Sequence, residues 1–341
     1  MLRPTVKVVL LTCLASTLAL GADQGPKTLR MASTVSWTVP PFQSHGSAQC
    51  DDDANLYFEV AGAPENSTVV MKVAHDGSKY ELYTLPSEPG VLANYAGFSI
   101  THSGELRVLR VNRYKADKPT NPANPYIGGK TSVFVYLYDS GPNNPSQETL
   151  DLPEHLGGLS FAAFESGAVL VTGYFTKHAD EQQQGKVYTA VFQPLGKLAA
   201  EIPESGKVDF AVVATKLRES AAISGDDGFL YVLQPDSVIV VSESGAIVRK
   251  LPFTKPNPDY MADMIYESKG QLVVELYKDE GRGKPFAAQY LVMNASTGER
   301  MGLYEPEESL GNDVLCFSRN EGLTFWTKKD GKDVLALAPL R

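Results

Sequence analysis

Short apolar and aromatic runs, each bounded by Gly, Pro, Asn or Asp, recur along almost the whole chain. Val133–Tyr138, Leu230–Leu233, Val238–Val241 and Leu272–Val274 are examples. β-Branched and aromatic residues between turn residues are typical of β-strands. No apolar stripe at i, i+3, i+4 and i+7 is long enough to indicate a buried helix. The pattern therefore predicts an all-β protein.

A tight turn that leads into an apolar strand recurs at intervals of about 40 to 60 residues, a period found in propeller arrays. The turn precedes Leu56 and then recurs at Gly104, Gly167, Gly228, Gly270 and Gly322. A second landmark is an apolar residue followed by proline, as in Leu85–Pro86, Leu152–Pro153, Ile202–Pro203, Leu251–Pro252 and, more loosely, Tyr304–Pro306. Proline cannot donate to a strand ladder, so it suits the end of an outermost strand.

The two landmarks define six units of four strands, which predicts a six-bladed β-propeller of antiparallel blades. The blades are expected near 45–86, 94–153, 157–203, 218–252, 260–306 and 313–341. The sixth unit lacks one strand, and residues 28–39 form a spare strand that stops at Val39–Pro40. We expect this N-terminal strand to complete the last blade and close the ring. A pair of β-sandwiches is the alternative fold, but it would not explain the matching proline endings.

The first 21 residues have the layout of a secretory signal peptide: Arg3 and Lys7, an apolar run, then Ala19-Leu20-Gly21. Residues 22–341 then form one propeller domain, which we expect to be monomeric and secreted or periplasmic. No later segment has the length of a membrane span. A net charge of -9 without long charged blocks argues against nucleic acid and anionic membranes as partners.

The mature chain keeps two cysteines, Cys50 and Cys316, in the predicted innermost strands of blades one and six. These blades are neighbours across the ring closure. A disulfide there would hold the ring shut, provided that the two Cα atoms lie within bonding reach. Two buried free thiols are the alternative.

Long connections are predicted on only one face of the propeller, the face that carries the loops between blades and between second and third strands. Binding residues concentrate on long loops of rigid scaffolds, so we expect the binding site there. The candidates are Arg113, Tyr114, Tyr126, His178, Tyr260, Asp263, Arg282, Asn312 and Asp313. The alternative for each one is a solvated loop residue without a function.

Two acidic turns are candidates for calcium, the ion that carboxylate-rich turns would take: Asp51–Asp53 and Asp226–Gly228. They occupy equivalent turns of blades one and four and lack EF-hand spacing, which favours polar turns without a metal. The five histidines have no metal-ligand spacing, and no G-x-S-x-G or H-E-x-x-H motif occurs. We therefore assign no catalytic residue, no metal ligand and no cofactor.

Residues Gly228–Pro252 run from a Gly-x-Leu-Tyr-Val-Leu strand through a Ser-Gly turn to Lys-Leu-Pro. This pattern resembles the NHL and related six-bladed propellers of secreted bacterial proteins. The resemblance implies the fold, and its relatives include protein-binding scaffolds and metal-dependent lactonases similar to gluconolactonase. We expect a non-enzymatic propeller that binds a protein, peptide or glycan. The alternative is a calcium-dependent hydrolase or lactonase with its ion in the axial channel.

Overall fold

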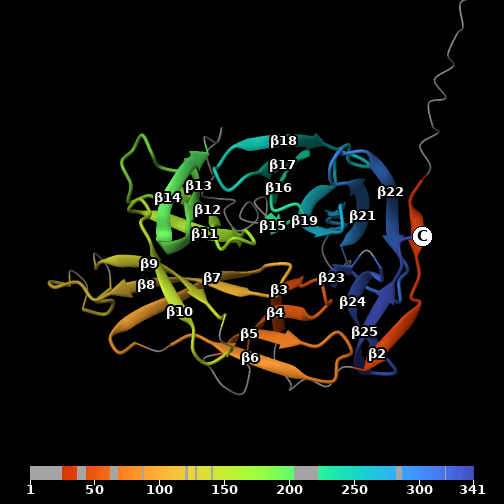
Figure 1. The fold of residues 1–341 in the computed structure, drawn as a ribbon, viewed down its shortest axis with the longest axis horizontal. Coiled ribbons are helices and arrows are strands. Elements are labelled where there is room, and N and C mark those ends of the chain that lie inside the picture. Colours follow the sequence, from red (N-terminus) through yellow and green to blue (C-terminus); the bar gives the residue numbers. More distant parts are fainter. Residues whose placement is uncertain are drawn as a thin grey trace, which may run out of the picture.

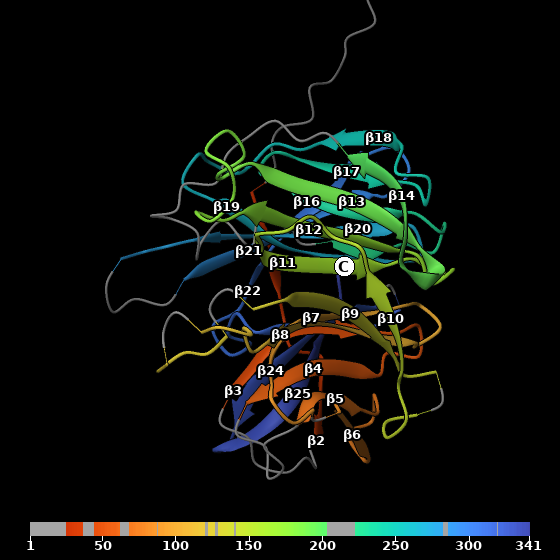
Figure 2. The same ribbon diagram turned by 90° about the vertical axis from the view of Figure 1, so that its left-hand side faces the viewer.

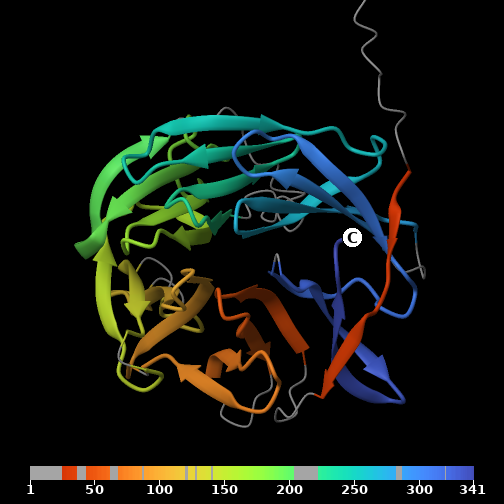
Figure 3. The same cartoon turned by 45° about the vertical axis from the view of Figure 1, so that its right-hand side comes forward.

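Six sheets surround a central axis in the computed structural model, which describes residues 25–36, 44–61, 68–86, 88–119, 122–126, 129–139, 141–202, 222–281, 286–318 and 320–341. Figure 1 and Figure 3 show the sheets arranged as the blades of a closed ring. The innermost strands contact each other in the order β3, β7, β11, β15, β19, β23 and back to β3. The predicted six-bladed β-propeller is therefore confirmed.

Apart from the N-terminal strands β1 and β2, the strands of each blade are antiparallel and follow the chain from the axis outward. Blade one contains β3 (Ser44–Cys50), β4 (Leu56–Ala61), β5 (Thr68–Val73) and β6 (Tyr80–Thr84). Blade two contains β7 (Val91–Ile100), β8 (Leu106–Tyr114), β9 (Thr131–Leu137) and β10 (Ser146–Leu150). Blade three contains β11 (Leu156–Ala163), β12 (Val169–Phe175), β13 (Val187–Gln193) and β14 (Lys197–Ile202), with a single 3-10 turn at Pro194–Gly196. Figure 2 shows blades two and three from the side.

The other three blades follow the same plan. Blade four contains β15 (Ala222–Ser224), β16 (Leu230–Gln234), β17 (Ser237–Val241) and β18 (Ile247–Pro252). Blade five contains β19 (Met261–Ser268), β20 (Gln271–Lys278), β21 (Ala287–Asn294) and β22 (Arg300–Pro306). Blade six contains β23 (Val314–Ser318), β24 (Gly322–Lys329) and β25 (Lys332–Ala338).

The N-terminal segment closes the ring, although not as one strand. Strand β2 (Ser33–Ser36) pairs antiparallel with β25 and supplies the missing outer strand of blade six. Strand β1 (Lys27–Leu29) instead pairs parallel with β22 and becomes a fifth strand of blade five. The expected single strand over 28–39 is wrong in this respect, and its Val39–Pro40 ending lies outside the described residues.

Hydrogen bonds explain why the segment changes blades between β1 and β2. The Glu307 side chain accepts a hydrogen bond from the backbone nitrogen of Met31 at 2.9 Å, and its own backbone nitrogen donates to Leu29 at 3.0 Å. Ala32 then donates to Leu337 of blade six at 2.8 Å. Leu29 is 1% exposed and packs in the apolar core between blades five and six. The segment thus fastens both blades.

The apolar core lies between the blades, where neighbouring sheets pack face to face. Each adjacent pair of blades shares one cluster of buried side chains. Tyr57 and Phe58, both at most 1% exposed, illustrate how alternate residues of β4 enter the clusters on its two sides. Period-two alternation on strands that are buried on both faces produces this arrangement.

The connections differ between the two faces of the ring. One face, here called the tight-turn face, carries the short turns between first and second strands and between third and fourth strands. In blade four such a turn ends at Gly228, whose φ of +77° is a left-handed conformation that glycine adopts readily. The opposite face, here called the long-loop face, carries the connections between blades and between second and third strands.

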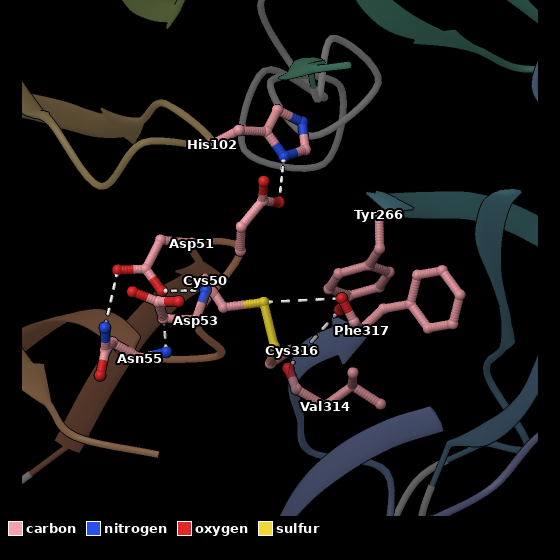
Figure 4. Close-up of a disulfide and its surroundings, with 10 residues drawn as sticks. Cys50, Asp51, Asp53, Asn55, His102, Tyr266, Val314, Cys316 and Phe317 are labelled. Carbon is pink, nitrogen blue, oxygen red and sulfur yellow. Dashed lines mark hydrogen bonds and ion pairs between the residues drawn. A yellow bond between two sulfur atoms is a disulfide. The ribbon is translucent and has the colours of Figure 1, made fainter. Parts of the chain in front are cut away.

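Cys50 and Cys316 form a disulfide between the innermost strands of blades one and six, with 5.5 Å between their Cα atoms (Figure 4). The bond joins residues on the two sides of the ring closure. A disulfide is compatible with an extracytoplasmic location, and the predicted signal peptide lies outside the described residues. The part of the chain that the structure describes contains no helix with the length and hydropathy of a membrane span.

Candidate functional site

Side chains from five blades converge around His102 on the tight-turn face. Asp52, His102, Glu165 and Asp226 lie in the turns between the first and second strands of blades one to four, and Glu267 lies near the end of β19 in blade five. We call these five residues the axial cluster. The corresponding turn of blade six contains Arg319, which lies outside the described residues.

The His102 ring is held on both of its nitrogens. Nδ1 lies 2.8 Å from Asp52 Oδ1 and 3.1 Å from Asp226 Oδ1. Nε2 lies 3.0 Å from the Ser224 carbonyl oxygen and 3.3 Å from Glu267 Oε2. Because all four neighbours are hydrogen-bond acceptors, both nitrogens donate when the ring is an imidazolium.

The surroundings favour this charged form of His102, whose side chain is 14% exposed. Burial alone lowers the pKa of an imidazole, but hydrogen bonds to Glu267 and Asp52 and the charge of Asp226 prevail and raise the pKa of His102 to about 10. In the metal-free protein the ring is therefore a cation at neutral pH. A ring protonated on both nitrogens cannot act as a general base.

Backbone contacts extend the cluster across the ring. Glu165 accepts hydrogen bonds from the backbone nitrogen of His102 and, at 3.2 Å, from the Ser103 hydroxyl. Glu267 accepts from the backbone nitrogens of Asp226 at 3.1 Å and Gly270 at 2.8 Å. These bonds and those of the His102 ring join the tight turns of blades one to five in one polar network.

The local turns explain why the cluster residues face the axis. In blade one, Asp51 Oδ1 accepts hydrogen bonds from the backbone nitrogens of Asp53 and Asn55, an arrangement typical of an Asx turn (Figure 4). Its Oδ2 accepts from Tyr57 at 3.1 Å. Both oxygens of the Asp51 carboxylate are therefore bound by groups of blade one. Its neighbour Asp52, whose side chain is half exposed, extends to His102.

In blade four, two neighbouring aspartates again have different partners. Asp227 Oδ2 accepts hydrogen bonds from Tyr231 at 2.9 Å and from Arg249 at 2.7 Å. Its neighbour Asp226 points instead to His102. In each of the two acidic turns, one aspartate (Asp51 or Asp227) binds groups of its own blade, and its neighbour (Asp52 or Asp226) joins the axial cluster.

The residues predicted as ligand-binding lie on four blades. Arg113, Tyr114 and Tyr126 belong to blade two, where β8 ends and the chain continues toward β9, and His178 is exposed after β12 of blade three. Tyr260 is 7% exposed and packs in the core between blades four and five. Arg282 lies outside the described residues.

The structure brings Asp263 and Asp313 toward the same junction between blades five and six. Burial raises the pKa of Tyr266 and Tyr290, and the charge of Glu275 adds to both shifts. The charge of Asp263 also raises the pKa of Tyr266, and the charge of Asp313 raises the pKa of Tyr290. Both carboxylates therefore lie near this pair of tyrosines. Asn312, next to Asp313, donates to the carbonyl oxygen of Phe286.

An exposed apolar patch lies at the long-loop end of blade five. Met261 is 44% exposed and Phe286 is 55% exposed. The Tyr277 ring meets Phe286 edge to face, with 5.8 Å between centroids, and its hydroxyl lies 3.9 Å from the Met261 sulfur. We call Met261, Tyr277 and Phe286 the blade-five patch. Asn312 adds a polar group beside it.

Sequence reasoning placed the site on the long-loop face and did not find the axial cluster. His102, Glu165 and Glu267 are far apart in the chain and match no local motif. A signal was nevertheless present, because the turn landmarks assign all three to equivalent ends of innermost strands. Aligning the six units on their turns would have placed them together.

Comparisons with known proteins bear on the fold. No protein-family model matches the chain, and no curated protein matches it. A member of the DUF4221 family from Bacteroides vulgatus has a TM-score of 0.52 at 10% identity, covering 91% of this chain and 97% of that one. A gluconolactonase from Xanthomonas campestris has a TM-score of 0.45 at 11% identity, covering 91% and 98%. At 10% identity the likeness to the DUF4221 protein bears on the fold alone, and the six sheets of this chain identify it as a six-bladed β-propeller; its resemblance to NHL-like propellers stays a resemblance.

Proposed function

We propose that the chain is a secreted, non-enzymatic binding or scaffold propeller that recognises a protein, peptide or glycan on its long-loop face. The blade-five patch is the observation that carries this proposal. The exposed side chains of Met261 and Phe286 lie there together with the Tyr277 ring. The side-chain amide of Asn312 lies beside them. Aromatic and methionine side chains next to polar groups are enriched where proteins bind partners.

The rest of the ring supports a scaffold role. The axial cluster and the Cys50–Cys316 disulfide join the blades on the tight-turn side. A rigid frame lowers the entropic cost of presenting loops to a ligand. The long-loop face thus combines fixed strand ends with exposed binding groups.

Binding can be tested with two defined probes, a random peptide display library and a glycan array. We expect the wild-type protein to select ligands from one of them, and Phe286→Ala to weaken binding of the selected ligand at least about tenfold, as at an aromatic interface anchor. Leu195→Ala is the matched control, because Leu195 is 84% exposed in a tight turn of blade three. Equal losses in both variants, or no selected ligand from either probe, would contradict the proposal.

A metal-dependent hydrolase or lactonase is the second candidate function. The convergence of carboxylates on His102 favours it, because such groups can hold an ion that polarises an ester carbonyl. Hydrolysis of a panel of lactones and esters, before and after chelation, separates the two functions. The binding proposal predicts no turnover in either state, and chelator-sensitive turnover would replace it with the hydrolase.

A further inference from the structure

The axial cluster has a geometry that suits a metal ion, independently of any ligand on the long-loop face. We propose that the cluster binds one divalent transition-metal ion through His102 Nδ1 and carboxylate oxygens of Asp52 and Asp226. Each residue belongs to a different blade, so the ion would join blades one, two and four at the axis. The proposal concerns a structural ion and assigns it no catalytic step.

The spacing of the ligand atoms supports the proposal. His102 Nδ1 lies 2.8 Å from the Asp52 oxygen and 3.1 Å from the Asp226 oxygen. All three atoms lie within 4.8 Å of one another. Neighbouring ligands on one ion, at bond lengths of about 2.0–2.2 Å, are about 3 Å apart. The cluster therefore needs little rearrangement to take an ion.

The second nitrogen of the ring provides an independent observation. Nε2 lies against the Ser224 carbonyl oxygen at 3.0 Å and the Glu267 carboxylate at 3.3 Å. Metal-binding histidines nearly always donate their other N–H to a carbonyl or a carboxylate, which fixes the ring and leaves the first nitrogen for the metal. The Glu267 side chain is 1% exposed, and its hydrogen bond from Asp226 also orients a proposed ligand.

Ser224, whose carbonyl oxygen holds the His102 ring, also carries a buried hydroxyl. The Ser224 Oγ has no hydrogen-bond partner among the described residues, and Ser224 is 1% exposed. Ser224 pairs with Leu230, whose side chain packs toward blade three, so its hydroxyl faces the blade that carries Glu165. A fully buried hydroxyl without a partner is costly unless an ion or a water completes its contacts.

The charge balance of the cluster also favours a cation. Asp52, Asp226 and Glu267 place three carboxylates against one imidazole, and Glu165 adds a fourth at the His102 backbone nitrogen. The mixture of an imidazole nitrogen with carboxylate oxygens suits zinc, cobalt, nickel or manganese. Calcium prefers oxygen ligands throughout and fits this set less well. We therefore name the transition metals as the ligand class.

The test uses the full chain, stripped with chelator and titrated with Zn²⁺, Mn²⁺ and Ca²⁺ while bound metal and the melting temperature are measured. We expect about one tightly held Zn²⁺ or Mn²⁺ per chain, a melting temperature raised by about 5 °C at saturating metal, and weaker binding of Ca²⁺. Asp52→Asn should weaken binding at least about tenfold, the loss typical even of an altered hydrogen-bond partner of a metal ligand. Its half-exposed side chain makes this variant compatible with folding.

Asp53→Asn is the matched control, because it removes the same charge from the next residue of the same turn, which is exposed and outside the axial cluster. It should bind metal like the wild type. Three results would overturn the proposal: no metal uptake and an unchanged melt, equal loss in both variants, or preferred uptake of Ca²⁺. None of them bears on binding at the long-loop face, so the two proposals fail separately.

Discussion

The two ends of the propeller axis are built on different principles. At the tight-turn face, four blades place carboxylate side chains within hydrogen-bonding distance of one histidine of a fifth blade. At the long-loop face, the candidate residues are spread over four blades, and the main exposed feature is the apolar patch of blade five. Equivalent short turns bring equivalent positions together around a ring. Loops of unequal length do not bring equivalent positions together, so their residues can differ from blade to blade.

If the tight-turn face holds the ring together, removing its disulfide should give the largest loss of stability. Cys50→Ala combined with Cys316→Ala opens a link between residues 266 positions apart. A closed loop of that size is expected to contribute about 5 kcal/mol to the free energy of unfolding. Urea denaturation of the double variant measures the loss. Reducing the wild-type protein should reproduce it, and an unchanged midpoint would show that the link is dispensable.

Replacing the central histidine should have the next largest effect. In chelator-treated protein, His102→Gln removes the cation that the surrounding carboxylates share, and breaking a buried ion pair in this way costs about 3 kcal/mol. His178→Gln is the control, because His178 is exposed on the long-loop side. Urea denaturation of both variants sharpens the comparison. Similar losses of unfolding free energy in the two variants would show that the two faces do not differ in this respect.

Removing the charge of a carboxylate outside the axial cluster should have the opposite effect and raise stability. Glu59 of blade one is half-buried, and burial raises the pKa of its carboxyl above the ordinary value. A carboxyl with a raised folded pKa costs stability once the pH exceeds its unfolded pKa, and costs nothing below it. Glu59→Gln should therefore raise the melting temperature by about 1 °C at pH 7 and lose this advantage near pH 4.

The exposed Glu299, changed to Gln, controls for the effect of net charge on this comparison. It should leave the melting temperature unchanged at both pH values. A gain at pH 7 from both variants would attribute the effect to overall charge. A loss of stability in Glu59→Gln would show that the carboxylate has a stabilising partner.

The smallest effect on stability is expected from the blade-five patch. Met261→Ser and Phe286→Ser change side chains that are about half exposed, so the free energy of unfolding should stay within about 0.5 kcal/mol of the wild-type value. Urea denaturation checks this. A loss above about 1 kcal/mol would show that the patch belongs to the core and is not free for a ligand.

The sequence was sufficient for the architecture because its signals are local and repeated. Gly228 marks a tight turn and Pro252 ends an outer strand, and the same landmarks recur in the other blades. The closing role of β2 also followed, since blade six visibly lacked a strand. The parallel strand β1 did not follow, because three residues carry no pattern and depend on contacts with Glu307.

The axial cluster could be predicted only in part. Asp52 and Asp226 were recognised as members of equivalent turns, yet each turn contains a second acidic residue that its own tyrosine binds. Nothing local tells the two carboxylates of a pair apart. The choice depends on which side chain faces the axis, and that is fixed by turn geometry and by the position of His102 in another blade.

The crossing of the N-terminal segment from blade five to blade six has a consequence for biogenesis. Residues 27–36 are synthesised well before their partners in β22 and β25. The N-terminal segment therefore stays unpaired until β22 and β25 have been synthesised, and unpaired strands of this kind invite association between chains. Chains interrupted before β25 should depend on chaperones and be degraded, whereas a circular permutant that joins the segment directly to the sixth blade should fold without this delay.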